Sequence, residues 1–268
     1  MSERSRPRPP IWIRVFLPLT FVALYLPLVV MVVSSFLERN VGEESYSMSL
    51  RWYFEVVKDP VLWAALWRSF IVATVSSSIA TVLGMIAALA LDRWKFTGRW
   101  FLKALSTLSL ILPELVLALS LLSWFALLQV HLSLMTVVIA HVTLTLPFVV
   151  MVIAARLKGL ERSYDEAARD LGATELQILF KVTLPLLLPS LVSGFVLAFL
   201  LSFDDFIVTF YTNGAGEDTL PIRLYSMMRT GISPKIQALS SIMLLISVIL
   251  IAFLVQIRGR TSFVIEQE

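Results

Sequence analysis

Three carboxylate side chains stand inside long apolar stretches of this sequence, and they are the residues whose chemistry is most evident. They are Glu114 in one stretch and the adjacent pair Asp204 and Asp205 in another. An ionisable residue in such a stretch is costly unless it faces a cavity, a partner or a polar interface. No basic residue inside these stretches stands ready to neutralise the acids. A polyvalent cation is therefore an attractive counter-charge, because carboxylates pair readily with ammonium groups.

Helical counting places these acids at two depths. At 1.5 Å per residue, Glu114 lies about 15 to 20 Å from the inner end of its stretch, and the aspartates about 25 to 30 Å along theirs. Adjacent helical residues point about 100° apart, so at most one aspartate faces a given cavity. Asp204 is the favoured one, with the Ser202 hydroxyl next on that face. Trp52 offers a ring face on which a cation can stack.

Each of these residues also has a plainer interpretation. Glu114 can be protonated, or can bond to a neighbouring helix. The aspartates can be interfacial, or can pair with a residue of an external protein. Trp52 can belong to an aromatic belt at the membrane surface.

The sequence contains no pattern for catalysis, a cofactor or a metal. There is no cysteine and there are only two histidines, and neither H-E-x-x-H nor the phosphate loop G-x-x-x-x-G-K-[ST] occurs. His141, in an apolar stretch, is expected to be packed and hydrogen-bonded, and His131 to face solvent. We expect no catalytic, cofactor-binding or metal-binding residue in this chain, and no intramembrane hydrolase.

Most of the chain is apolar enough to lie in lipid. Hydrophobic residues make up 58% of it and charged residues 15%, whereas a soluble domain carries roughly 25% charged residues. We expect an all-α, polytopic membrane protein, 1–268 forming a single transmembrane domain, because a span takes about 20 apolar residues. The six candidate spans are 11–36, 69–91, 101–128, 134–155, 186–210 and 236–257.

The basic residues indicate how the spans are oriented. With the N-terminus inside, the inner segments hold fifteen lysines and arginines and the outer segments seven. Because basic residues accumulate in cytoplasmic segments, both termini are expected in the cytoplasm. The first span follows Arg4, Arg6 and Arg8 and is interpreted as uncleaved. The net charge of +3 is then a signal of topology, and no nucleic-acid partner is expected.

Small residues repeat every four positions along the second span, at Ser76, Ala80, Gly84 and Ala88. They lie on one helix face and allow another helix to approach closely, which matters in lipid because packing drives helix association. We expect this face to pack within the chain.

The inner loop 160–185 has more structure than a connection between two spans requires. Its first half has the periodicity of an amphipathic helix. Ser163 and Glu166 have the spacing of a capping box, and Gly172 is placed to end the helix in a left-handed conformation. A second capping pattern begins at Thr174. The sequence therefore predicts a helix, a tight turn and another helix.

This loop resembles the EAA loop of bacterial binding-protein-dependent importer permeases. The matching residues are Glu166, Ala167, Ala168, Gly172, Leu184 and Pro185, with Val182 where isoleucine is common. In that family the loop forms coupling helices that dock into a groove on the ATPase subunit. The resemblance implies the same coupling role for these residues, a role compatible with helix capping by Glu166.

A longer resemblance, to the spermidine/putrescine permease subunits, covers nearly the whole chain. It rests on the segments LRWYFEVV, AHVTLTLPFVV, ARLKG, EAARDLGA, LSFDDFIV and LPIRLYSMMRTGISPKIQAL. It implies a heterodimer with a second permease subunit, two ATPase subunits that bind ATP and magnesium, and an external or periplasmic substrate-binding protein. It also implies a bacterial inner-membrane location and a polyamine cargo, whose extended length is comparable to the difference in depth between Glu114 and the aspartates.

Two alternatives remain open. A permease of the same family can import another cargo, such as an amino acid, a metal complex or an oxyanion, although an anion conflicts with three unpaired acids. A proton-coupled secondary carrier can use Glu114 as a relay. The capped loop disfavours this carrier, because a carrier has no ATPase to engage.

Overall fold

The computed structural model describes residues 11–39, 46–160, 163–231 and 233–265. Arg4, Arg6 and Arg8, and residues 161–162 of the inner loop, lie outside the described residues. The chain divides into two units. The smaller unit combines Met1–Asp59 with Met227–Leu244, and the larger combines Pro60–Ser226 with Leu245–Glu268.

The smaller unit contains a long apolar helix followed by a short hairpin and an amphipathic helix. Its elements are α1 (Ile11–Ser35), β1 (Leu37–Arg39), β2 (Tyr46–Met48) and α2 (Arg51–Lys58). The end of α1 is joined to α2 through Tyr53, whose hydroxyl lies 2.6 Å from Ser35 Oγ and whose ring lies 5.0 Å from that of Phe36. Lys235 Nζ lies 2.7 Å from the Asp59 carboxylate in the same unit.

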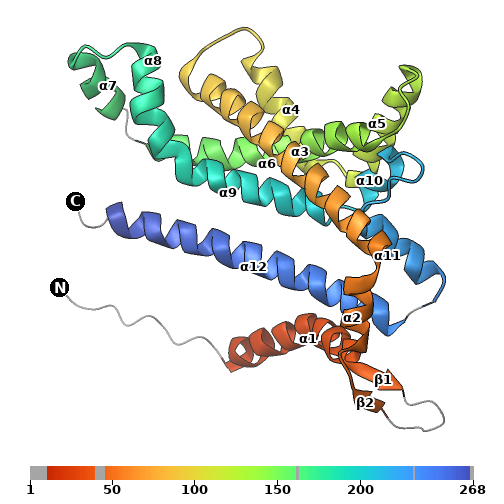
Figure 1. Ribbon diagram of the computed structural model, residues 1–268. Coiled ribbons are helices and arrows are strands. Elements are labelled where there is room, and N and C mark those ends of the chain that lie inside the picture. The colour runs from red at the N-terminus through yellow and green to blue at the C-terminus, as the bar shows by residue number, and fades with distance from the viewer. Residues whose placement is uncertain (1–10, 40–45, 161–162, 232, 266–268) are drawn as a thin grey trace. The chain divides into compact units, whose positions relative to one another are not determined.

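The described residues of the larger unit form helices joined by short connections (Figure 1). Its elements are α3 (Pro60–Arg93), α4 (Arg99–Ile111), α5 (Glu114–Leu127), α6 (Leu134–Lys158), α7 (Ser163–Asp170), α8 (Glu175–Ile178), a π-helical segment (Leu179–Thr183), α9 (Leu184–Phe203) and α10 (Ile207–Thr212). The last two helices, α11 (Leu220–Arg229) and α12 (Pro234–Ile265), have residues in both units.

Three long helices, α3, α6 and α9, pack on one another and form the core of the larger unit. They meet at Val149 of α6, which is fully buried. A Cβ atom on Gly84 of α3 would lie 2.7 Å from Val149 Cγ1, and one on Gly194 of α9 would lie 3.3 Å from the same atom. The two glycines thus allow both helices to approach α6 closely, and the predicted packing of the small-residue face within the chain is confirmed.

Five of the described helices are long and apolar enough to cross a membrane. They cover Trp12–Ser35, Pro60–Arg93, Leu134–Lys158, Glu175–Phe203 and Pro234–Ala252. A polytopic, nearly all-helical protein is therefore confirmed, although two of the six expected spans are interrupted.

The stretch 101–128, expected as one span, is divided into α4 and α5. Leu112 and Pro113 between them have extended backbones, with ψ angles of 135° and 132°. The expectation of a continuous helix was wrong because proline lacks an amide donor and disfavours helical geometry in the preceding residue. Glu114 consequently becomes the first residue of α5.

The stretch 186–210 is also not one helix. Helix α9 ends at Phe203, and α10 begins only at Ile207. The Asp205 carboxylate accepts hydrogen bonds from the amides of Val208, at 3.3 Å, and Thr209, at 2.8 Å. An aspartate that satisfies these first-turn amides starts a new helix, which explains why the apolar run does not continue α9.

We predict that Gly84→Ala lowers the thermal unfolding midpoint of the purified protein in detergent. The new methyl group meets Val149, and overpacking of this kind costs about 1–3 kcal/mol, more than the roughly 1 kcal/mol by which alanine favours a helix over glycine. Removing the obstructing methyl groups with Val149→Ala should recover part of the loss in the double variant.

The matched control is Gly159→Ala. Gly159 caps the end of α6 with a negative φ of −91°, which alanine can also adopt, and its added Cβ would meet only the Arg156 carbonyl oxygen, at 3.5 Å. A Gly84→Ala variant as stable as Gly159→Ala would contradict the tight contact.

Candidate functional site

A buried polar network centred on His141 connects four helical elements of the larger unit. The His141 Nδ1 atom lies 2.6 Å from Ser202 Oγ, and Nε2 lies 2.9 Å from Thr209 Oγ1 and 3.0 Å from Asp205 Oδ2. Ser202 Oγ lies a further 3.0 Å from Ser76 Oγ on α3. All five residues are buried, so the network fastens α3, α6, α9 and the start of α10 together.

The network decides two expectations about the acids and their neighbours. His141 was expected to be packed and hydrogen-bonded, and this is confirmed. The expected lack of a basic partner concerned only the stretches that hold the acids; Asp205 contacts the His141 imidazole of another helix, α6. Ser202, expected beside Asp204 on the substrate path, lies in the buried network and is 4% exposed.

The three acids line one cavity of about 490 Å³. Its other lining residues are Leu197, Leu200, Leu201, Phe206, Ile207, Ser247 and Ile251. Asp204 is exposed and accepts a 3.0 Å hydrogen bond from Ser247, while the carboxyl group of Glu114 contacts that of Asp205. None of the lining residues is lysine, arginine or histidine, so the cavity combines apolar walls with a concentration of carboxylates.

The expected difference in depth between Glu114 and the aspartates was wrong. Glu114 begins α5, Asp205 precedes α10, and α10 packs against α5. The count along continuous helices failed because both helices are interrupted beside the acids. Two carboxyl groups in contact repel one another unless a proton or a cation lies between them, so this pair either shares a proton or binds a cation.

Trp52 belongs to α2 in the smaller unit. The guanidinium carbon of Arg51 already lies 5.3 Å from the Trp52 ring centroid, a cation–π contact within the chain. The indole Nε1 atom is buried and has no hydrogen-bond partner among the described residues. A role for Trp52 on a substrate path stays a prediction.

The loop 160–185 has the predicted form of a helix, a turn and a second helix. Helix α7 ends at Asp170, and Gly172 follows it with φ +81°. The Gly172 amide donates to the Arg169 carbonyl at 2.8 Å, and the Ala173 amide donates to the Ala168 carbonyl at 3.0 Å. This pair of bonds is the Schellman arrangement, in which glycine takes the left-handed position. The predicted helix end is confirmed.

The second predicted cap is also confirmed. The Thr174 amide donates to Gln177 Oε1 at 2.9 Å, and the Gln177 amide donates to Thr174 Oγ1 at 3.4 Å. Arg169 and Glu175 form an exposed ion pair at 2.8 Å that joins α7 to α8, and this hydrogen bond lowers the pKa of Glu175. The reciprocal bonds of the Ser163 and Glu166 cap stay a prediction.

The EAA-like residues occupy both ends of this loop. Glu166 and Ala167 are exposed on α7, and Ala168 is half-buried. Leu184 and Pro185 begin α9 directly after the π-helical segment, and Pro185 lacks the amide that would donate a hydrogen bond within this continuous helical stretch. Nothing lies within 4 Å of a Cβ atom placed on Gly172, so the backbone conformation alone requires glycine there.

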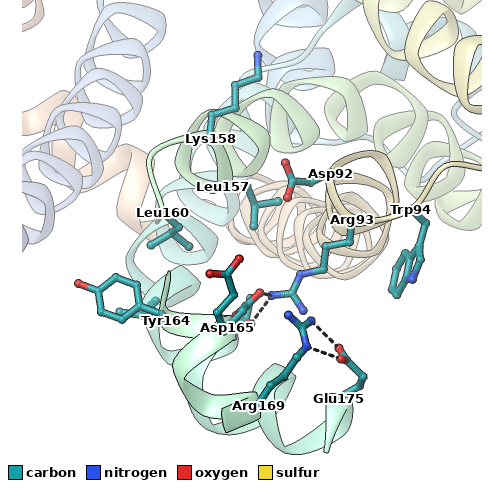
Figure 2. Close-up of a pocket in the computed structure, with 13 residues that line it drawn as sticks. Asp92, Arg93, Trp94, Leu157, Lys158, Leu160, Tyr164, Asp165, Arg169 and Glu175 are labelled. Atoms are coloured by element: carbon teal, nitrogen blue, oxygen red, sulfur yellow. Dashed lines mark hydrogen bonds and ion pairs between the residues drawn. The ribbon is translucent and has the colours of Figure 1, made fainter. Parts of the chain in front are cut away.

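A second cavity, of about 650 Å³, lies between this loop and the ends of α3 and α6 (Figure 2). Its lining residues are Asp92, Arg93, Trp94, Leu157, Lys158, Leu160, Tyr164, Asp165, Glu166, Arg169, Glu175, Thr183 and Leu186. Arg93, at the end of α3, lies 2.8 Å from Asp165 of α7 and donates to Thr183 Oγ1 at 2.6 Å.

Sequence reasoning missed two residues of these sites. In the sequence, Arg93 was only one of the basic residues that indicate topology, and no local pattern predicts its contacts with Asp165 and Thr183. Thr209 carried a usable signal, because Asp205 stands before a short apolar helix in the manner of a capping residue.

The sequence matches characterised transport proteins. A family model described as "Binding-protein-dependent transport system inner membrane component" matches residues 80–261. The spermidine/putrescine transport system permease protein PotC of Escherichia coli (strain K12) is 36% identical over 236 residues, which cover 88% of this chain and 89% of PotC.

Two further relatives have different cargoes in their names. The putrescine transport system permease protein PotI of Escherichia coli (strain K12) is 37% identical over 240 residues, covering 87% of this chain and 85% of PotI. The sulfate transport system permease protein CysT of Salmonella typhimurium (strain LT2) is 31% identical over 219 residues, covering 76% of this chain and 79% of CysT.

Solved structures share the fold at lower sequence identity. A bacterial ABC transporter involved in the import of the acidic polysaccharide alginate matches with a TM-score of 0.67 and 18% identity, covering 94% of this chain and 99% of that chain. The MetNI methionine ABC transporter, in inward-facing conformations, matches with a TM-score of 0.55 and 17% identity, covering 82% of this chain and 99% of that chain.

We predict that His141→Leu destabilises the protein by about 3 kcal/mol, because removing one partner of a buried charged or hydrogen-bonded pair leaves the other unsatisfied. Its partners Asp205 and Ser202 have little access to water. The thermal unfolding midpoint in detergent measures the effect. His131→Leu is the control, since His131 is exposed. Equal midpoints for the two variants would show that the network contributes no stability.

Proposed function

Because this chain belongs to the family of binding-protein-dependent transport system inner membrane components, we propose that it is a permease subunit of an ATP-driven importer that carries a polyamine. The family membership follows from the model match over residues 80–261 and from the relatives that are 36% and 37% identical to this chain over the aligned residues. The identity of the cargo needs a separate argument, which comes from the acidic cavity.

The acidic cavity is the observation that carries the polyamine assignment. A polyamine bears several ammonium groups separated by methylene segments. Glu114, Asp204 and Asp205 supply carboxylates for the ammonium groups, and the leucine, isoleucine and phenylalanine side chains of the walls supply apolar contacts for the methylenes. Ammonium groups are compact and need no bidentate geometry, so carboxylates facing one cavity from different elements suit them.

The three acids have unequal parts in this assignment. Asp204 is exposed to the cavity and has only the Ser247 hydroxyl as a hydrogen-bond partner among the described residues, so it is the residue most available to a cargo. Glu114 is half-buried beside it. Asp205 is held by His141 and by the first turn of α10, and contributes charge from behind the cavity wall.

An oxyanion cargo is the competing assignment, because the sulfate permease CysT is also a relative. A sulfate ion entering the described cavity would meet three carboxylates and no lysine or arginine among the lining residues. Repulsion from like charges disfavours it. The same cavity gives an amino-acid carboxylate no basic partner.

We place the membrane topology and partners as follows. The interrupted pair α4 and α5 together makes the third of six spans, both termini are cytoplasmic, and the loop 160–185 faces the cytoplasm. The chain pairs with a second permease subunit, and two ATPase subunits bind ATP and magnesium on their own chains. An external binding protein delivers the cargo. The excess of basic residues on the proposed inner side supports this orientation.

The loop 160–185 is the proposed contact with the ATPase. It projects an exposed α7, and the Schellman turn at Gly172 and the Thr174 capping box hold α7 and α8 in one arrangement. Because α8 continues through the π-helical segment into α9, a push on the loop is passed to a helix of the membrane core. Glu166, Ala167 and Ala168 are the part of α7 expected at the interface.

We predict that Glu114→Gln and Asp204→Asn each raise the spermidine concentration for half-maximal uptake by about tenfold, the effect of losing about 1.4 kcal/mol of charge pairing. Uptake of labelled spermidine by cells that depend on this importer measures it. Ser247→Ala, which changes the same cavity without removing a charge, is the control and should change the value about twofold at most. Unchanged uptake in both acid variants would refute the cation site.

We predict that Gly172→Ala and Glu166→Ala leave membrane insertion intact and lower the amount of cargo transported per ATP hydrolysed. The glycine change imposes about 1–2 kcal/mol of left-handed strain on the turn that sets the angle between α7 and α8. Gly159→Ala, in a helical conformation, is the control. Normal coupling in both test variants would remove the loop from the coupling path.

A further inference from the structure

Arg93 joins three elements that are distant in the sequence. It is the last residue of α3. Its guanidinium makes a 2.8 Å ion pair with Asp165 of α7 and a 2.6 Å hydrogen bond to Thr183 at the end of the π-helical segment (Figure 2). A guanidinium has five N–H donors in a fixed plane, so it can hold two acceptors from different elements at a fixed separation.

Helix α7 depends on polar ties of this kind because it has no apolar anchor. None of its eight residues is buried, so the hydrophobic effect does not fix its position. The Arg169–Glu175 pair joins α7 only to the neighbouring α8, and its side chains are 48% and 69% exposed. The Arg93–Asp165 pair reaches across to α3, and its side chains are 20% and 23% exposed. Solvent screening weakens the first pair more than the second.

The other contact of Arg93 falls where the loop turns into the membrane core. Thr183 is buried and ends the π-helical segment that connects α8 to α9. Such wide turns are rare within helices and often occur at functional positions. Arg93, at the end of α3, therefore contacts α7 and the segment that leads into α9 at the same time.

We propose that Arg93 is a positioning residue for energy coupling: it locks α7 to the cytoplasmic ends of α3 and α9, so that displacement of α7 moves both helices together. The proposal rests on the coupling role proposed for the loop 160–185. It adds α3 as a second route into the core, beside the covalent connection through α8, and assigns the link to one side chain.

The test uses the complete importer, with its partner permease, ATPase subunits and binding protein, reconstituted in lipid vesicles. Labelled spermidine uptake and ATP hydrolysis are measured on the same preparation. For Arg93→Ala we expect the ratio of spermidine transported to ATP hydrolysed to fall about five- to tenfold, the range expected when a residue on a coupling path is removed. Arg93→Lys keeps the charge opposite Asp165 and should recover part of the ratio.

Arg99→Ala is the matched control. Arg99 begins α4, at the other end of the short connection that follows Arg93, but its guanidinium donates locally to the Leu91 carbonyl, at 2.7 Å, and to no described residue of the loop 160–185. For Arg99→Ala, the ratio of spermidine transported to ATP hydrolysed should equal that of the unmodified importer. Asp165→Asn removes the ion pair while leaving the Thr183 contact, and should reproduce most of the effect of Arg93→Ala.

Hydrogen–deuterium exchange of the assembled complex supplies a readout that needs no cargo. Without its tie to α3, α7 should open more often, and its amides in Arg93→Ala should exchange about tenfold faster while those of α6 are unchanged. Unchanged exchange in α7 together with an unchanged transport ratio would overturn the proposal. Faster exchange throughout α3 and α6 would overturn it too, because Arg93 would then stabilise the whole unit.

The failures of the two proposals are distinguishable. If the unmodified importer does not transport spermidine, the cargo assignment fails, and the exchange of α7 still decides whether Arg93 holds it. If the unmodified importer transports spermidine and Arg93→Ala matches it in ratio and in exchange, only the role of Arg93 fails.

Discussion

A carboxylate in lipid must be given partners by the protein itself, and Asp205 shows how much of this structure follows from that requirement. Its oxygens accept hydrogen bonds from the amides of Val208 and Thr209 and lie against the His141 imidazole. The first contacts end α9 and begin a new helix, and the last draws α6 to the same point. Because water cannot satisfy a buried carboxylate there, each of these bonds constrains the helices that supply it.

The break created at Asp205 also makes the acidic cavity possible. In an uninterrupted helix, Asp204 and Asp205 would point to different sides, and Glu114 would lie in the middle of another helix. The interruptions at Pro113 and at Asp205 instead place the first residue of α5 beside the start of α10. Irregular backbone inside a membrane is tolerated where it lines a cavity or is buried in protein, and here it brings the acids together.

The helical core and the loop 160–185 are held together by different interactions. Helices α3, α6 and α9 approach through glycine and buried alanine side chains around Val149, since close packing is what holds helices together in lipid. The loop 160–185 is held by caps, ion pairs and a glycine turn, with α7 free of buried side chains. A close-packed core joined to a polar loop that is held by its own bonds is suited to transmit a displacement imposed by another protein.

Much of this could be predicted from the residues in order along the chain. Apolar runs predicted the membrane helices, and the repeat that contains Gly84 predicted the close-packed face. The caps at Gly172 and Thr174 were predicted as they are found, because each depends on residues three to five positions apart. The family resemblance was visible for the same reason, since its motif lies within one continuous loop.

Contacts between distant segments could not be predicted in this way. Ser76 meets Ser202 across 126 residues, and Arg93 meets Thr183 across 90. Periodicity tells which face of a helix is apolar or small, but it does not tell which other helix that face will meet. The pairing of Glu114 with Asp205 was therefore missed, and the depths assigned to them were wrong. Local composition determined the helices and their caps, whereas only the packing of interrupted helices on one another decided which charges share a cavity.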